Sequence, residues 1–157
     1  MSLATLPELS RFEISQAALD AERGQVMTFS ISTLLTRNLD DVFSENDSAR
    51  RRTAIDEIFH EDAVYYVRSG VYRGRDEIER IATVIRADFS DYRFQPLAPP
   101  EELGNGGRLR WESGRSGYGP SFAGTDFIIA RDDRIAAVYR FFDKLPDSRE
   151  NLWTPAD

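Results

Sequence analysis

The residue with the strongest claim to chemistry is Asp126, which lies in a β-rich run, 121–130. A second run follows after Asp132-Asp133, a pair typical of a two-residue hairpin turn. Regular pairing across that turn places Asp126 opposite Tyr139. A carboxyl group beside aromatic rings is shielded from water, which raises its pKa. Such a group can donate or accept a proton near neutral pH. Asp126 is therefore the first candidate acid/base.

The same pairing assigns Asp126 its neighbours. Because side chains alternate along a strand, Tyr139, Phe141 and Asp143 share its face. We expect Tyr139 and Phe141 to bind a ligand and Asp143 to be the second acid/base candidate. Plainer alternatives stay open: Asp126 could bond nearby backbone at a strand entrance, and Asp143 could be a strand-end carboxylate in water. A turn one residue shorter would put Asp126 on the face opposite Tyr139.

Three further side chains are candidates for a ligand pocket. Trp111 could form an aromatic wall or fill the core. Tyr65 and Tyr66 point to opposite faces of their strand, and one of them should face the pocket. Arg68 could anchor a carboxylate or an enolate, or it could form a surface ion pair.

The elements that must position these residues follow from hydrophobic spacing. Apolar residues recur at helical spacing in three segments, 25–44, 49–59 and 75–89. Shorter β-rich runs separated by Gly, Pro and Asp residues predict strands at 62–67, 71–72, 92–97, 108–113, 121–130 and 134–143. Three helices before a long, mostly antiparallel, curled sheet predict an α+β fold with the helices on one face.

The length of 157 residues suits one domain. We divide the chain into an N-terminal extension (1–22), a domain (23–145) and a C-terminal tail (146–157). Thr5–Pro7 could begin a short helix that carries Leu9, Phe12 and Leu19. These terminal segments could cover the mouth of a pocket or extend a dimer contact.

Composition excludes several kinds of function. A net charge of −7 disfavours nucleic acid and anionic membranes as partners, and Arg50-Arg51-Arg52 is typical of a solvated helix face. Cysteine is absent and His60 is the one histidine, so thiolate and multi-histidine metal sites are excluded. His60, at the end of the second predicted helix, should bond the last helix carbonyls or face solvent. We expect no cofactor, no metal and no signal peptide, and therefore a cytoplasmic location.

Several motifs, in this order, carry a family resemblance. They are Phe59-His60-Glu61-Asp62-Ala63-Val64-Tyr65, Gly70-x-x-x-Gly74-x-x-x-Ile78, Arg110-Trp111-Glu112, Gly124-Thr125-Asp126-Phe127-Ile128, Asp133-Arg134-Ile135 and Phe141-Phe142-Asp143. Together they resemble the SnoaL-like branch of the nuclear transport factor 2-like superfamily over about 25–143. The resemblance implies a cone-shaped, cystatin-like roll with three helices packed on a strongly curved sheet. It does not specify a reaction, because the fold hosts isomerases, dehydratases, cyclases, hydrolases and binding modules.

The resemblance also suggests roles for single residues. Asp143 is similar to the acid/base aspartate of SnoaL-like cyclases. Asp126 resembles the neutral, hydrogen-bond-donating aspartate of ketosteroid isomerase, which is a standard example of this chemistry. That enzyme's base position is occupied here by Val67, and 25–44 contains no tyrosine, so steroid isomerisation is not expected. The epoxide hydrolase arrangement could be supplied by Arg110, Asp126 and Asp143.

Three functions remain open at this point. The chain could be a cofactor-independent lyase, isomerase, cyclase or hydrolase that acts on a small hydrophobic ligand with an aspartate acid/base. It could instead be a non-catalytic ligand-binding module. It could also be a homodimer that associates through an apolar sheet face with Phe127, Ile129, Val138 and Phe142. For the enzyme hypothesis, Asp126→Asn should abolish turnover and leave the fold intact.

Overall fold

The structure is a computed structural model that describes residues 28–146. Its helical elements are α2 (Ile31–Arg37), the π-helical η1 (Asn38–Phe43), α3 (Ser48–Ile58) and α4 (Arg75–Asp88). Its strands are β1 (Phe59–Val67), β2 (Gly70–Arg73), β3 (Tyr92–Pro96), β4 (Glu101–Leu103), β5 (Gly106–Arg115), β6 (Pro120–Arg131) and β7 (Arg134–Lys144). The predicted α+β class is confirmed.

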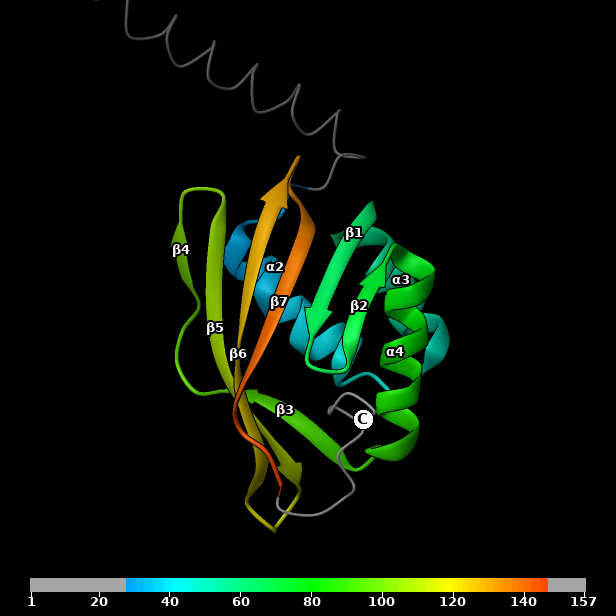
Figure 1. The fold of residues 1–157 in the computed structure, drawn as a ribbon, viewed down its shortest axis with the longest axis vertical. Helices are drawn as coiled ribbons and strands as arrows, with labels where there is room; N and C mark the ends of the chain where they lie inside the picture. Colours follow the sequence, from blue (N-terminus) through cyan, green and yellow to red (C-terminus); the bar gives the residue numbers. More distant parts are fainter. Residues whose placement is uncertain (1–27, 147–157) are drawn as a thin grey trace, which may run out of the picture.

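All seven strands belong to one sheet (Figure 1). The order is β2-β1-β7-β6-β5-β3, and β4 pairs with β5 outside this path. The β1–β7 pair is parallel and the other pairs are antiparallel. The sheet curls, and the helices pack on its concave face, where the core lies. None of the helices in 28–146 is long and apolar enough to cross a membrane.

The first predicted helix, 25–44, is two elements in the part that the structure describes. Ser30 caps α2 by accepting a hydrogen bond from the Thr33 backbone N–H. From Asn38 the turns widen into the π-helical η1, a geometry often found at functional sites. The extra residue per turn was not predicted, because spacing alone assumes a regular helix.

Asp47 caps α3, since its side chain accepts a hydrogen bond from the Arg50 backbone N–H. Two other local features differ from the sequence prediction. His60 lies in β1, where its Nε2 contacts the Arg131 carbonyl oxygen, rather than at a helix end. Strand β4 was missed, because Glu101-Glu102-Leu103 has no alternating pattern of its own and depends on pairing with β5.

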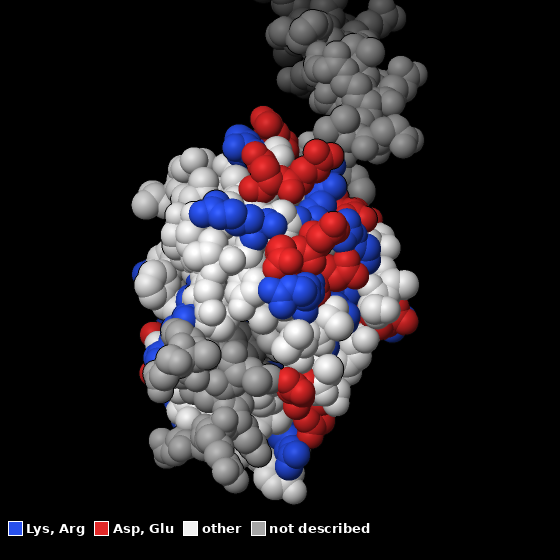
Figure 2. All heavy atoms as spheres, turned by 45° about the vertical axis from the view of Figure 1, so that its right-hand side comes forward, with Lys and Arg blue, Asp and Glu red and all other residues white. Residues whose placement is uncertain are grey.

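The basic run on α3 is only partly solvated. Arg52 forms ion pairs with Asp56, Asp76 and Glu79. Arg51 is instead buried and donates to the Glu45 carbonyl and to Thr83. Figure 2 shows basic and acidic side chains intermixed on this side of the molecule.

The turn between β6 and β7 has the predicted two residues. Asp132 and Asp133 have φ angles of 51° and 60°, the left-handed conformation that a tight hairpin turn needs and aspartate tolerates. The pairing does not stay regular. Ala130 pairs with Ile135, but Ile129 pairs with Ala137, so Ala136 is an extra residue in a β-bulge.

This bulge corrects the predicted register. Beyond it, Asp126 pairs with Arg140 and Phe127 pairs with Tyr139. Because one extra residue moves the following side chains to the other face, Arg140 points into the core and Tyr139 points out. The predicted partner of Asp126 was therefore wrong by one position.

Candidate functional site

The site is built around Asp126, which is completely buried in the middle of β6. Its Oδ1 accepts hydrogen bonds from Trp111 Nε1 at 3.0 Å and from Arg140 Nε at 2.7 Å. Its Oδ2 accepts from Arg140 Nη2 at 2.8 Å and from Asn38 Nδ2 at 3.4 Å. A carboxylate has about four lone-pair positions, so these four bonds saturate it.

Arg140 is held from two directions. Its guanidinium forms a bidentate pair with Asp126, and it lies among four aromatic rings. The distances from its Cζ to the ring centroids are 4.3 Å for Phe43, 4.9 Å for Phe94, 5.0 Å for Trp111 and 5.5 Å for Tyr65. Burial by itself would lower the pKa of Arg140, but the Asp126 carboxylate and Tyr65 together more than offset this, and the pKa is raised. Arg140 therefore stays charged in the core.

Two buried oxygens beside the ion pair have no hydrogen-bond partner within the described chain. They are the hydroxyl oxygen of Tyr65 and the amide oxygen Oδ1 of Asn38. Burial raises the pKa of Tyr65, and nearby Arg140 opposes this only in part, so the hydroxyl stays protonated. A buried polar group without a partner costs about 1–3 kcal/mol, which makes these two atoms candidate ligand contacts.

Of the predicted pocket residues, Trp111 and Tyr65 lie in this core and have no exposed surface. Tyr66 lies on the other face of β1, as alternation required. Trp111 combines the two roles considered from sequence, because it fills the core and donates to Asp126.

Tyr139, Phe141 and Asp143 do not share a face with Asp126. Tyr139 is 39 % exposed and its ring stacks on that of Tyr66, with 4.6 Å between the ring centroids. Phe141 is 58 % exposed. Asp143 is exposed and accepts a bond from Thr125 Oγ1 at 3.3 Å. The bulge at Ala136 is the physical reason, because it turns these side chains to the convex face. Arg68 is exposed just after β1.

Sequence reasoning missed Arg140 and Asn38. A signal for Arg140 was present, because the core residues Ile135 and Val138 are three positions apart and regular alternation cannot bury both. Asn38 interrupts an apolar helix pattern between Leu35 and Leu39, and such a buried amide requires polar partners.

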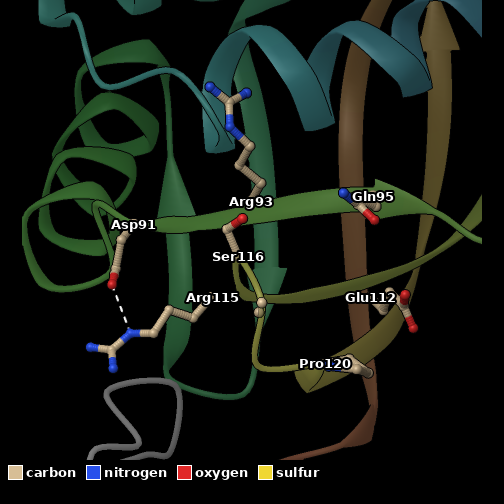
Figure 3. A pocket seen from close by; sticks show the side chains of 10 residues that line it. Asp91, Arg93, Gln95, Glu112, Arg115, Ser116 and Pro120 are labelled. Atoms are coloured by element: carbon tan, nitrogen blue, oxygen red, sulfur yellow. Dashed lines mark hydrogen bonds and ion pairs between the residues drawn. The ribbon is translucent and has the colours of Figure 1, made fainter.

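Three surface pockets lined by described residues are separate from this core. The pocket in Figure 3, of about 340 Å³, lies over β3 and β5. Arg115 and Asp91 form an ion pair on one side of it, and Gln95 and Glu112 lie on the other. The second lies beside η1 and α3, and the third lies at β4. None of the three is lined by Asp126, so none of them is the predicted pocket.

The sequence comparison identifies the family of the chain. Residues 37–138 match the SnoaL-like domain. The chain belongs to the SnoaL-like family of the nuclear transport factor 2-like superfamily. This confirms the resemblance drawn from the sequence motifs. No protein with curated function matches the chain.

Solved structures similar to this SnoaL-like domain agree with that assignment. A proposed isomerase of the SnoaL-like family from Agrobacterium tumefaciens has a TM-score of 0.68 and 25 % identity, over 72 % of this chain and 97 % of that one. A proposed polyketide cyclase from Sinorhizobium meliloti has a TM-score of 0.56 and 21 % identity, over 69 % of this chain and 93 % of that one.

A third similar structure supports the predicted roll. It is a protein of unknown function with a cystatin-like fold from Methylobium petroleophilum, with a TM-score of 0.58 and 16 % identity, over 78 % of this chain and 83 % of that one. The predicted cystatin-like roll is thereby confirmed.

Proposed function

We propose that this SnoaL-like domain binds a small, largely apolar carbonyl compound inside the curled sheet and acts on it as an isomerase or a cyclase. The observation that carries the proposal is the buried Tyr65 hydroxyl without a partner, beside a charged guanidinium and among aromatic rings. The family match supports the reaction class, because its structural relatives include proteins described as isomerases and cyclases.

The arrangement assigns a different task to each polar group. Tyr65 donates its hydrogen bond to the carbonyl oxygen of the ligand. Arg140, 5.5 Å from the Tyr65 ring, stabilises the negative charge that develops on that oxygen as an enolate forms, when the carbon next to the carbonyl loses a proton to the Asp126 carboxylate in the opened site. Such electrostatic stabilisation is strong here because water is excluded.

Asp126 has a positioning task in this proposal. Its two oxygens are saturated by Trp111, Arg140 and Asn38, so it could exchange a proton only after one of these bonds breaks. We therefore propose that Asp126 holds Arg140 in place and that a role as acid/base requires the site to open. The ligand also needs such an opening, in which the helical layer moves away from the sheet.

The test is a Tyr65→Phe variant, because it removes only the hydroxyl without a partner. We expect binding of small cyclic ketones and of phenols, which imitate an enolate, to weaken about tenfold or more, consistent with loss of a hydrogen bond to a charged oxygen. Binding is measured by two-dimensional NMR and by thermal shift with a mixed pool of these compounds. Tyr66→Phe, on the opposite face of β1, is the matched control. No binding by the native chain, or equal binding by both variants, would contradict the proposal.

We also propose that the convex face of the sheet makes a homodimer. Phe127, Ile129, Tyr139 and Phe141 are 39 %, 41 %, 39 % and 58 % exposed and come from the adjacent strands β6 and β7. Together these four residues form the convex patch. An apolar cluster of this kind on a sheet favours association. Of the four residues on the apolar face predicted from sequence, Phe127 and Ile129 lie in this patch, whereas Val138 is buried and Phe142 packs against the core.

A further inference from the structure

The amide of Asn38 has a hydrogen-bonding need that the described chain does not meet. Asn38 is fully buried in η1, and its Nδ2 donates to Asp126 Oδ2 at 3.4 Å. A carboxylate only accepts hydrogen bonds, so the amide must turn its nitrogen toward Asp126 and its oxygen Oδ1 elsewhere. That oxygen also only accepts, and no donor within 28–146 reaches it. A ligand that pairs with Asn38 Oδ1 must therefore supply a donor.

The Tyr65 hydroxyl has the opposite need. It is buried in β1 and has no hydrogen-bond partner among the described residues. Because burial raises the pKa of Tyr65, the hydroxyl stays protonated and can donate to an acceptor on a ligand. Both groups lie at the same ion pair, since Asn38 bonds Asp126 and the Tyr65 ring centroid is 5.5 Å from Arg140 Cζ. A ligand with one acceptor and one donor would satisfy both groups.

The two groups belong to different layers of the domain (Figure 1). Tyr65 lies on β1 in the sheet, and Asn38 begins η1, which continues α2 in the helical layer. A ligand that enters between the layers, as the proposed function requires, meets both. The Asn38 bond is the longest of the four to Asp126, so it gives way most easily when the layers separate. The predicted N-terminal helix and the tail after Pro146 lie outside the described residues, so no contact is assigned to them.

Charge decides what kind of donor the ligand carries. Asp126 and Arg140 neutralise each other, and both side chains are almost completely buried. An ammonium group beside Asn38 would add an unpaired charge to this core, which is very costly, whereas a hydroxyl group adds none. Four aromatic rings surround the guanidinium, so the rest of the ligand is apolar.

We propose that the ligand is a neutral hydroxy ketone, whose carbonyl oxygen accepts from Tyr65 and whose hydroxyl donates to Asn38 Oδ1. This inference rests on the proposed function, to which it adds the second polar group of the same ligand. A ketone without that hydroxyl would bury Asn38 Oδ1 unpaired and should therefore bind more weakly.

Isosteric pairs of ketones test the inference on the native full-length chain. Phenacyl alcohol and propiophenone differ only in a hydroxyl group that replaces a methyl group. The pair β-hydroxypropiophenone and butyrophenone differs in the same way, one carbon further from the carbonyl. We expect the hydroxyl member of at least one pair to bind about tenfold more tightly than its methyl partner, because only it supplies a donor to Asn38. Titration followed by two-dimensional NMR measures the dissociation constant of each ketone.

Two variants separate the tasks of the two groups. Asn38→Leu removes the acceptor with little change in side-chain size, so the roughly tenfold preference for the hydroxyl member should disappear. Tyr65→Phe removes only the contact with the carbonyl oxygen, so it should weaken both members of a pair to the same extent and leave the preference in place. Urea denaturation checks that both variants fold. The comparison on the native chain decides the matter even if Asn38→Leu does not fold.

The outcomes distinguish this inference from the proposed function. Equal binding of the two members of each pair by the native chain would overturn the inference, and so would an unchanged preference in Asn38→Leu. In either case the binding of ketones, and with it the proposed function, would stand. If the native chain binds none of these ketones, the proposed function is wrong and the inference is wrong with it.

Discussion

The four hydrogen bonds to Asp126 change what is expected of its substitution. From sequence alone, Asp126→Asn should remove activity and leave the fold unaffected. In the structure, Asp126 is the counter-charge of Arg140, and both side chains are almost completely buried. A charge left unpaired in such a core is costly, so loss of activity in this variant would not by itself identify a catalytic group.

We therefore expect Asp126→Asn to lower the free energy of unfolding by about 3–5 kcal/mol. Arg140→Met should also destabilise the fold, because it leaves the carboxylate unpaired. The double variant Asp126→Asn/Arg140→Met should recover most of the loss, since no charge then remains in the core. Urea denaturation of all three measures the coupling. Asp143→Asn, at an exposed position, is the control; if Asp126→Asn is no more destabilising than this control, the buried-pair interpretation is wrong.

At the scale of elements, two features of the hairpin set the site. The bulge at Ala136 aligns Arg140 with Asp126. Gly124 gives Trp111 the space to reach Asp126, because a Cβ there would lie 2.5 Å from Trp111 Cζ2 and 2.4 Å from the Phe141 carbonyl oxygen. Strand β6 thus approaches its neighbours closely at one position that only glycine can occupy.

Gly124→Ala should therefore destabilise the protein by about 1–3 kcal/mol or more, because neither the backbone nor the indole can move away without strain. It should also change the NMR chemical shift of the Trp111 indole N–H, whose bond to Asp126 depends on that position. Thr125→Ala, the next residue on β6, points to the convex face and should change neither quantity markedly. An unchanged indole signal in Gly124→Ala would show that the close contact does not position Trp111.

At the scale of the whole molecule, the two faces of the sheet have different tasks. The concave face holds the core and the buried polar groups, and the helices cover it. The convex face bears the convex patch, with Tyr66 stacked on Tyr139. A stable protein interface buries about 800 Å² per partner, so such a patch would be the centre of a contact that extends over neighbouring strands.

Sedimentation equilibrium should show a dimer for the native chain, and Tyr139→Ser/Phe141→Ser should weaken it about tenfold or more, because apolar contact area is lost. The fold should persist, since both side chains are outside the core. Tyr118→Ser is the control, because Tyr118 is 78 % exposed at the β5–β6 turn, away from the patch. A monomeric native chain would refute the homodimer.

The sequence by itself indicated the family and most of the elements, although it did not predict β4 or the π-helical η1. Alternation in 121–130 and 134–143 located β6 and β7 within one residue at each end, and spaced motifs such as Gly124-Thr125-Asp126 indicated the fold. These features are local, because they depend on propensity and on which residues can be buried. Tyr65 and Trp111 were also named as ligand-pocket candidates, with core filling as the alternative for Trp111.

Only the tertiary structure decided which side chains meet Asp126. Phe127 and Ile129 made both faces of β6 apolar, so the pattern did not distinguish inside from outside. The extra residue Ala136 then reversed the facing of Tyr139, Phe141 and Asp143 and brought Arg140 inward. Register is a property of paired strands, and one inserted residue changes every contact beyond it without altering the strand itself.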